Sequence, residues 1–208
     1  STLLASSAAS DVYKRQTYAK YYEALISSRD ERLEHFTAVG VAVSQMCRDP
    51  LLLYSAQALE DHKQGLCTYA VEQVVLAIVV TTGIASIFLT KDYTPDYNSG
   101  LAHAIFYALT AYPVIEERHL HGEVVAFGIL IALLVDGQKE EFEKIYELNK
   151  SIGLPTRLSD IEITPAQWEE CLDRIPTMSD VAHYPYKVTR PMLENAMKTL
   201  EERAVSHR

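Results

Sequence analysis

The chain has 208 residues, of which 48% are apolar and 23% are charged. This is the composition of a globular protein, and a chain of this length can bury about 70% of its unfolded surface in one or two cores. The formal net charge is −9, and the basic residues are scattered along the sequence. A nucleic-acid partner is therefore not expected, because phosphate binding needs clustered Lys and Arg.

The first sixteen residues, STLLASSAASDVYKRQ, differ from the rest of the chain. They are rich in Ser and Ala and show no apolar periodicity, and they lack the basic region and apolar core of a secretory signal. They resemble the translated linker sequence found in assembled environmental (metagenomic) reads. We expect residues 1–16 to be a non-native, disordered segment, and residues 17–208 to be one domain cut from a longer chain.

From Thr17 onward, apolar residues recur at spacings of three and four, and no long stretch alternates with a period of two. This pattern predicts an all-α fold with many helices. The predicted helices cover residues 17–28, 31–48, 50–65, 68–90, 99–112, 121–136, 138–152, 164–174 and 190–206. Ser99 is a candidate N-cap, Thr164 followed by Pro165 is a second one, and Gly153 is expected to end the helix before it.

The most apolar segment is VVLAIVVTTGIASIFL, residues 74–89. Its sixteen residues fall short of the roughly 20 needed to span a bilayer, so the segment predicts a buried core helix and no membrane partner. The cysteines Cys47, Cys67 and Cys171 are widely spaced and form no CxxC pair. We interpret them as buried thiols in a reducing compartment, which predicts a cytoplasmic protein.

Two histidines fall on neighbouring predicted helices, His103 within one and His121 at the start of the next. An antiparallel helix pair can bring such residues to one point, and imidazole is the commonest metal ligand at neutral pH. His103 shares a mostly apolar face with Phe106 and Tyr107, which also fits a hydrogen-bonded core histidine. Two histidines are too few for a catalytic zinc, which takes three protein ligands. Spacing alone leaves both interpretations open.

The residues around His121 offer further candidates. Glu123 could orient His121 or its neighbours, and it could equally be a glutamate favoured by the start of a helix. His119 points away from His121 on the turn, so we expect it at the solvated rim. The remaining histidines have charged or terminal surroundings and are expected on the surface; they are His35, His62, His183 and His207.

The motifs GLAHAIFYALT and HGEVVAFGIL resemble the metal-binding helices of glycerol dehydrogenase and its relatives in the iron-containing alcohol dehydrogenase superfamily. The resemblance continues through CRDPLLLYSAQALEDHKQG and KSIGLPTRLSDI, so it covers nearly all of residues 17–208. It implies that the chain is the all-helical C-terminal domain, which holds a divalent metal. The N-terminal α/β domain, which binds NAD(P) in such enzymes, is missing; the eight dispersed glycines of the chain form no GxGxxG phosphate loop.

The resemblance also implies the metal ligands, which in relatives are one aspartate and two histidines. His103 and His121 fall on the two histidine positions, and Gln16, just before TYAKYYE, occupies the aspartate position. An amide lacks the charge of a carboxylate, so we predict weak or partial occupancy by zinc or iron. Phe106 stands where relatives often have a further histidine, and it cannot transfer a proton.

By resemblance, the parent protein is a metal-dependent, NAD(P)-linked dehydrogenase of glycerol or another small polyol. A hydroxycarboxylate (2-oxo acid) reductase and a non-catalytic helical module are the alternatives. A lyase like dehydroquinate synthase needs extra basic residues, and Arg118 is the only nearby candidate. We expect the chain to be inactive alone and to form a homo-oligomer, since an apolar cleft face would be exposed without the cofactor domain.

Overall fold

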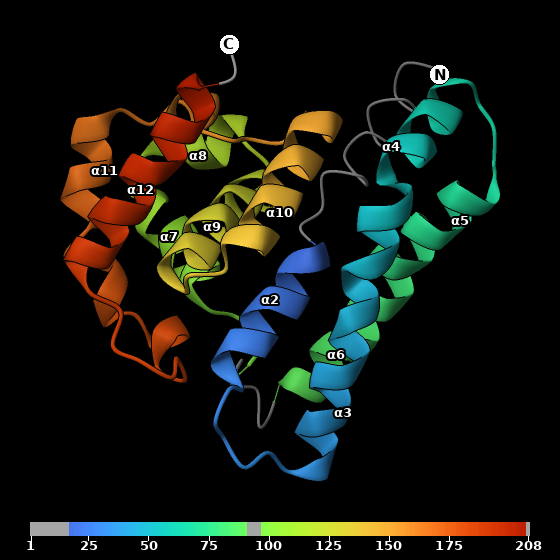
Figure 1. The fold of residues 1–208 in the computed structure, drawn as a ribbon, viewed down its shortest axis with the longest axis horizontal. Coiled ribbons are helices and arrows are strands. Elements are labelled where there is room, and N and C mark those ends of the chain that lie inside the picture. The colour runs from blue at the N-terminus through green and yellow to red at the C-terminus, as the bar shows by residue number, and fades with distance from the viewer. Residues whose placement is uncertain (1–16, 91–96, 207–208) are drawn as a thin grey trace.

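The computed structural model describes residues 17–90 and 97–206, and these residues form helices and connecting loops with no β-strand (Figure 1). The predicted all-α class is therefore confirmed for this part of the chain. The α-helices are α2 (Thr17–Ser27), α3 (His35–Ser44), α4 (Asp49–Lys63), α5 (Tyr69–Leu76), α6 (Thr82–Leu89), α7 (Leu101–Leu109), α8 (Pro113–Arg118), α9 (His121–Val135), α10 (Lys139–Ile152), α11 (Pro165–Cys171) and α12 (Arg190–Val205). Single turns of other helix types are η1 (Gln45–Cys47), η2 (Ala77–Thr81), η3 (Leu158–Ile161), η4 (Ile175–Thr177) and η5 (Ser179–Val181).

All nine predicted helices are present, with differences at their ends. The second begins at His35, because the chain turns at Asp30, whose φ of 64° lies in the left-handed region. The six-residue helix α8 was not predicted. The segment predicted to be foreign, residues 1–16, lies outside the described residues.

Two of the three predicted caps are confirmed. Thr164 and Gln167 form a reciprocal capping box ahead of Pro165, and Gly153 ends α10 with a φ of 75°. The Ser99 prediction is wrong, because the N-cap position of α7 is Gly100, which has no side chain to offer. The backbone N–H groups in the first turn of α7 donate instead to side chains that are distant in sequence.

The core is built around α9, in which eleven of the fifteen residues are buried. Helix α7 packs directly on α9, and the two backbones come very close at Gly128. A Cβ atom at this position would lie 2.8 Å from the Cα of Ala102. Glycine is therefore what allows the two helices that carry His103 and His121 to pack so tightly.

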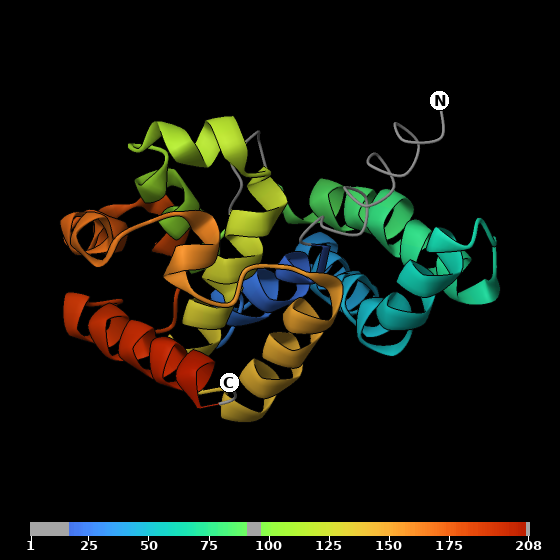
Figure 2. The ribbon, with the colours of Figure 1, turned by 90° about the horizontal axis from the view of Figure 1, so that it is seen from above.

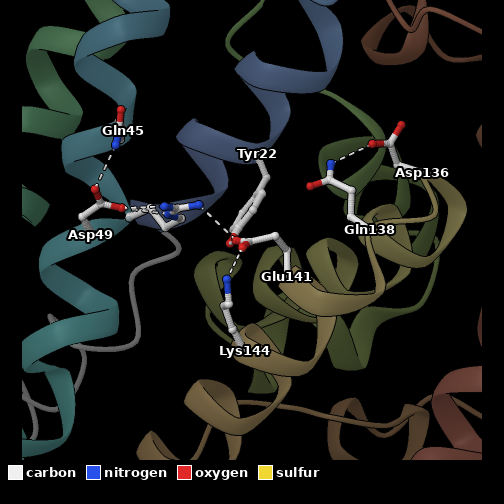
Figure 3. A network of polar contacts seen from close by, with 8 residues as sticks. Tyr22, Gln45, Asp49, Asp136, Gln138, Glu141 and Lys144 are labelled. Carbon is white, nitrogen blue, oxygen red and sulfur yellow. Dashed lines mark hydrogen bonds and ion pairs between the residues drawn. The ribbon is translucent and has the colours of Figure 1, made fainter.

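Helix α2 lies between the group formed by α3 to α6 and the group formed by α7 to α12 (Figures 1 and 2). Two buried tyrosines fix it against α10: the Tyr18 hydroxyl donates to Asn149 at 2.6 Å, and the Tyr22 hydroxyl donates to Glu141 at 2.6 Å. Lys144 also donates to the Glu141 carboxylate, as Figure 3 shows. These bonds position the residue after Tyr22, which is Glu23.

The apolar segment forms one continuous helix, Tyr69–Leu89, in which a π-helical turn at η2 joins α5 to α6. The helix has 21 residues, and only 28% of its most apolar stretch is buried. The prediction of a buried core helix is therefore wrong, because Leu76, Val79 and Ile87 point to solvent. Among the described residues, this is the one helix long and apolar enough to cross a membrane by length and composition, a test that helices of soluble proteins also pass.

The three cysteines are free. Cys47 and Cys171 are buried, as predicted, but Cys67 is exposed in the loop before α5, so that part of the prediction is wrong. Burial raises the pKa of the Cys47 thiol to about 11. Cys47 is therefore an inert thiol at neutral pH.

Candidate metal centre

His103 and His121 lie next to each other, with their ring centroids 5.3 Å apart. His103 lies in the first turn of α7, and its side chain is only 9% exposed. His121 is the first residue of α9 and is exposed as a whole. Phe106 packs edge-on against the His121 ring at 4.3 Å between centroids. The sequence-predicted pair is thus brought together, with an aromatic wall beside it.

A buried carboxylate, Glu23 of α2, contacts His103 at two points. The Nδ1 atom of His103 lies 2.6 Å from Oε2 of Glu23, and the backbone N–H of His103 donates to Oε1 at 3.1 Å. The Glu23 side chain is fully buried. Because Nδ1 is engaged by this carboxylate, Nε2 is the His103 nitrogen that remains for a ligand.

The His121 imidazole is neutral near pH 7. Partial burial of the ring lowers its pKa, the neighbouring His103 lowers it further, and Glu23 opposes them, which leaves a pKa of about 4. A neutral imidazole is the form that binds a metal ion.

The two rings fit a shared cation in spacing. Nitrogen–zinc distances of about 2.0–2.1 Å in a tetrahedral site place two imidazole centroids about 5 Å apart. Within residues 17–90 and 97–206, no group of three or more His, Cys, Asp or Glu side chains could hold a metal ion. The third position that the resemblance implies, Gln16, lies outside these ranges. Among the described residues, His103 and His121 can therefore supply two ligands of a metal site.

In addition to burial and the neighbouring His103, the positive charge of Lys20 acts on His121 and lowers the pKa of its ring. Lys20 of α2 donates from Nζ to the side-chain oxygen of Asn98 at 2.7 Å and to its backbone oxygen at 3.3 Å. Burial lowers the pKa of Lys20, while the Glu23 carboxylate opposes this effect. Sequence reasoning missed both Lys20 and Glu23 of α2, although they occur in the motif TYAKYYE that follows Gln16, the position where the resemblance implies a third ligand.

Glu123 has the role of a helix-start residue. Its carboxylate accepts the backbone N–H of Leu120 at 3.1 Å, which caps α9, and lies 3.8 Å from His119. The carboxylate that contacts the ring of His103 is that of Glu23. His119 is not at a solvated rim, since its side chain is 11% exposed and lies between Glu123 and Glu162.

The remaining candidates lie away from the pair. Arg118 forms an ion pair with Glu162 at 2.8 Å. His35 is exposed, and His62 and His183 are partly exposed, which agrees with their predicted surface positions. His207 lies outside the described residues.

Comparison with known proteins finds relatives that are dehydrogenases. The chain is 30% identical over 190 residues to hydroxycarboxylate dehydrogenase A of Escherichia coli. This alignment covers 89% of this chain and 51% of that protein. The chain is 32% identical over 147 residues to the glycerol dehydrogenase of Thermotoga maritima, covering 68% of this chain and 36% of the relative. The chain is therefore similar to glycerol dehydrogenases and to a hydroxycarboxylate dehydrogenase. No family model matches it.

A solved structure supports the same relationship. The probable glycerol dehydrogenase of Sinorhizobium meliloti superimposes with a TM-score of 0.78 at 25% identity, covering 96% of this chain and 56% of that one. The chain thus spans about half the length, or less, of these glycerol dehydrogenase-like proteins. Its helices correspond to the helical half of that fold, as the resemblance implied.

Proposed function

We propose that this chain is the metal-holding half of a glycerol dehydrogenase-like oxidoreductase, with His103 and His121 as two ligands of a divalent cation. The observation that carries the proposal is the pair of adjacent imidazoles, one neutral at pH 7 and the other oriented by a buried carboxylate. Zinc and iron both suit imidazole ligands. A cation bound here supplies Lewis-acid chemistry, lowering the pKa of a substrate hydroxyl.

The substrate class that we propose is a small polyol such as glycerol, with NAD(P) as the hydride acceptor. The cofactor would be bound by the α/β domain that the family resemblance implies, so this chain alone is expected to be inactive. The role of the described residues is to hold and orient the cation. Phe106, packed on His121, limits water on one side of the site.

A second candidate substrate is a 2-hydroxy acid. The hydroxycarboxylate dehydrogenase relative supports it, and so does the partly buried ammonium of Lys20, whose charge acts on His121, because an ammonium attracts a carboxylate. A Lys20→Met change in a chain fused to the cofactor half of a relative distinguishes the two. If this variant loses kcat/KM for a hydroxy acid but still oxidises glycerol, the result would favour a 2-hydroxy acid as the substrate.

We also propose the cellular and assembly setting. Two buried free thiols and one exposed free thiol fit a reducing cytoplasm. The apolar face of the helix Tyr69–Leu89 fits burial against a second copy of the chain, rather than contact with nucleic acid or membrane. Residues 1–16 are proposed to be foreign to the natural protein, and residues 17–208 to be its helical domain.

Zinc titration of the purified chain by calorimetry tests the metal proposal. We expect one weak, saturable site per chain, lost in His121→Ala and kept in His35→Ala, which removes an exposed histidine of α3. A chain that binds no zinc, or one whose binding survives His121→Ala, would show that the histidine pair is not a metal site.

A further inference from the structure

The side chain of Glu23 contacts His103 through both of its oxygens. It comes from α2, eighty residues earlier in the chain, and its side chain is fully buried. A buried carboxylate is costly unless its oxygens accept hydrogen bonds. The contacts to His103 therefore explain how this charge is tolerated between α2 and α7.

The two contacts have the same polarity, with His103 donating and Glu23 accepting, and this fixes the His103 ring. The backbone N–H of His103 can only donate, so Oε1 of Glu23 acts as an acceptor there. An ionised carboxylate accepts at both oxygens, so the Nδ1 atom at 2.6 Å from Oε2 carries a proton. The neutral imidazole then has its lone pair at Nε2.

We propose that Glu23 is the positioning residue of the site: it holds His103 in the Nδ1-protonated form and presents the Nε2 lone pair to the cation. A carboxylate bonded to the far nitrogen of a ligating histidine fixes the ring and raises its basicity. The inference rests on the proposed metal-holding function. Glu23 lies on α2, whereas the two histidines lie on α7 and α9. A residue of α2 would therefore help to set the affinity for the cation.

A Glu23→Gln variant separates this role from simple packing, because glutamine has the same shape. Its amide offers one acceptor and one donor, so it cannot accept from both the backbone N–H and Nδ1–H of His103. If the amide oxygen keeps the backbone bond, the amide NH₂ faces Nδ1 and favours the other tautomer. That tautomer carries its proton on Nε2, where the cation would bind.

The first test is the tautomer of His103 in the metal-free chain, read from long-range ¹H–¹⁵N spectra at about pH 8, above the usual histidine pKa. We expect Nδ1–H in the wild type and a shift toward Nε2–H in Glu23→Gln. Assignment comes from the signal that His103→Ala removes. A wild-type signal from Nε2–H, or an unchanged tautomer in the variant, would overturn the positioning role.

The second test is zinc affinity in the same variants. We expect binding to weaken by about 10–100-fold in Glu23→Gln, the range found for changes behind a ligating histidine. Glu123→Gln is the matched control, since the glutamine side-chain oxygen can still accept the backbone N–H of Leu120, and it should leave affinity unchanged. If the wild type binds no zinc, the metal function fails while the tautomer result still decides the role of Glu23. Unchanged zinc affinity in Glu23→Gln would contradict the positioning role alone.

Discussion

At the scale of single residues, the site depends on the protonation state of two imidazoles. His121 has a pKa of about 4, so the folded chain binds its proton more weakly than an unfolded chain does at the ordinary value of about 6.5. Protonation of His121 therefore favours unfolding. This contribution is absent above about pH 6.5 and destabilises the fold progressively as the pH falls toward 4.

The pH titration of His121 follows directly from this. The Cε1–H resonance of His121 should shift with a midpoint near pH 4, which is well below the ordinary histidine pKa of about 6.5. A His121 midpoint near 6.5 would mean that the ring is not enclosed by Phe106 and His103 in solution. With a midpoint near 6.5, zinc binding at pH 6 would have to release a proton from His121. With the expected pKa of about 4, the ring is already neutral at pH 6 and no proton is released from it.

We propose that Gln16, which occupies the aspartate position implied by the family resemblance, is a second residue that sets the affinity for the cation. An aspartate at this position would add a charged oxygen ligand, which hard and borderline cations prefer to an amide. We expect Gln16→Asp to tighten zinc binding at least tenfold, or about 1.4 kcal/mol, in a calorimetric titration. Equal affinities in the two chains would show that the residue before Thr17 is not a ligand.

At the scale of helices, the histidine pair depends on the close packing of α7 on α9. In Gly128→Ala, the added Cβ meets the Cα and carbonyl oxygen of Ala102, which are backbone atoms and cannot swing away. We expect a loss of about 1–3 kcal/mol in unfolding free energy. Gly83→Ala is the control: the position has open space around it, and alanine in a helix should be neutral or stabilising by up to about 1 kcal/mol.

Helix α2 is held by the buried bond from Tyr18 to Asn149. Tyr18→Phe leaves the Asn149 carbonyl without this donor, and we expect chemical denaturation to give a loss of about 1–3 kcal/mol. Tyr69→Phe should change stability little, because Tyr69 is largely exposed. If Tyr18→Phe also costs nothing, the Tyr18 hydroxyl does not fix α2.

These helices show what the sequence can predict and what it cannot. The apolar periodicity predicted α7 and α9, and residue order placed His103 and His121 on adjacent helices. Glu23 was missed because its partner is eighty residues away, and no local pattern records such a contact. Helix α8 was missed because six residues carry too little periodicity. The exposure of Ile87 was missed because apolar composition does not say which faces a fold covers.

At the scale of the whole molecule, one face lacks charge. Glu72 is the only charged residue in the helix Tyr69–Leu89, and its outward side exposes Leu76, Val79, Val80, Ile84 and Ile87. Phe36 of α3, itself exposed, stacks beside Phe88 and extends this surface. A monomer rarely leaves such a surface uncovered, so we expect self-association.

Sedimentation velocity tests the association. The chain should sediment as a dimer or larger particle at micromolar concentration, and Ile87→Glu should shift it toward the monomer. Ser151→Glu, on the exposed side of α10, adds the same charge elsewhere and should leave the distribution unchanged. A wild-type monomer throughout the micromolar range would contradict the prediction.

The proposed site requires one cation lying between two imidazoles. An anomalous difference map at the zinc absorption edge, from crystals of the chain soaked in zinc, locates that cation directly. We expect a single strong peak about 2.0–2.1 Å from Nε2 of His103 and from a ring nitrogen of His121. A peak elsewhere, or none between the two rings, would contradict the proposed site.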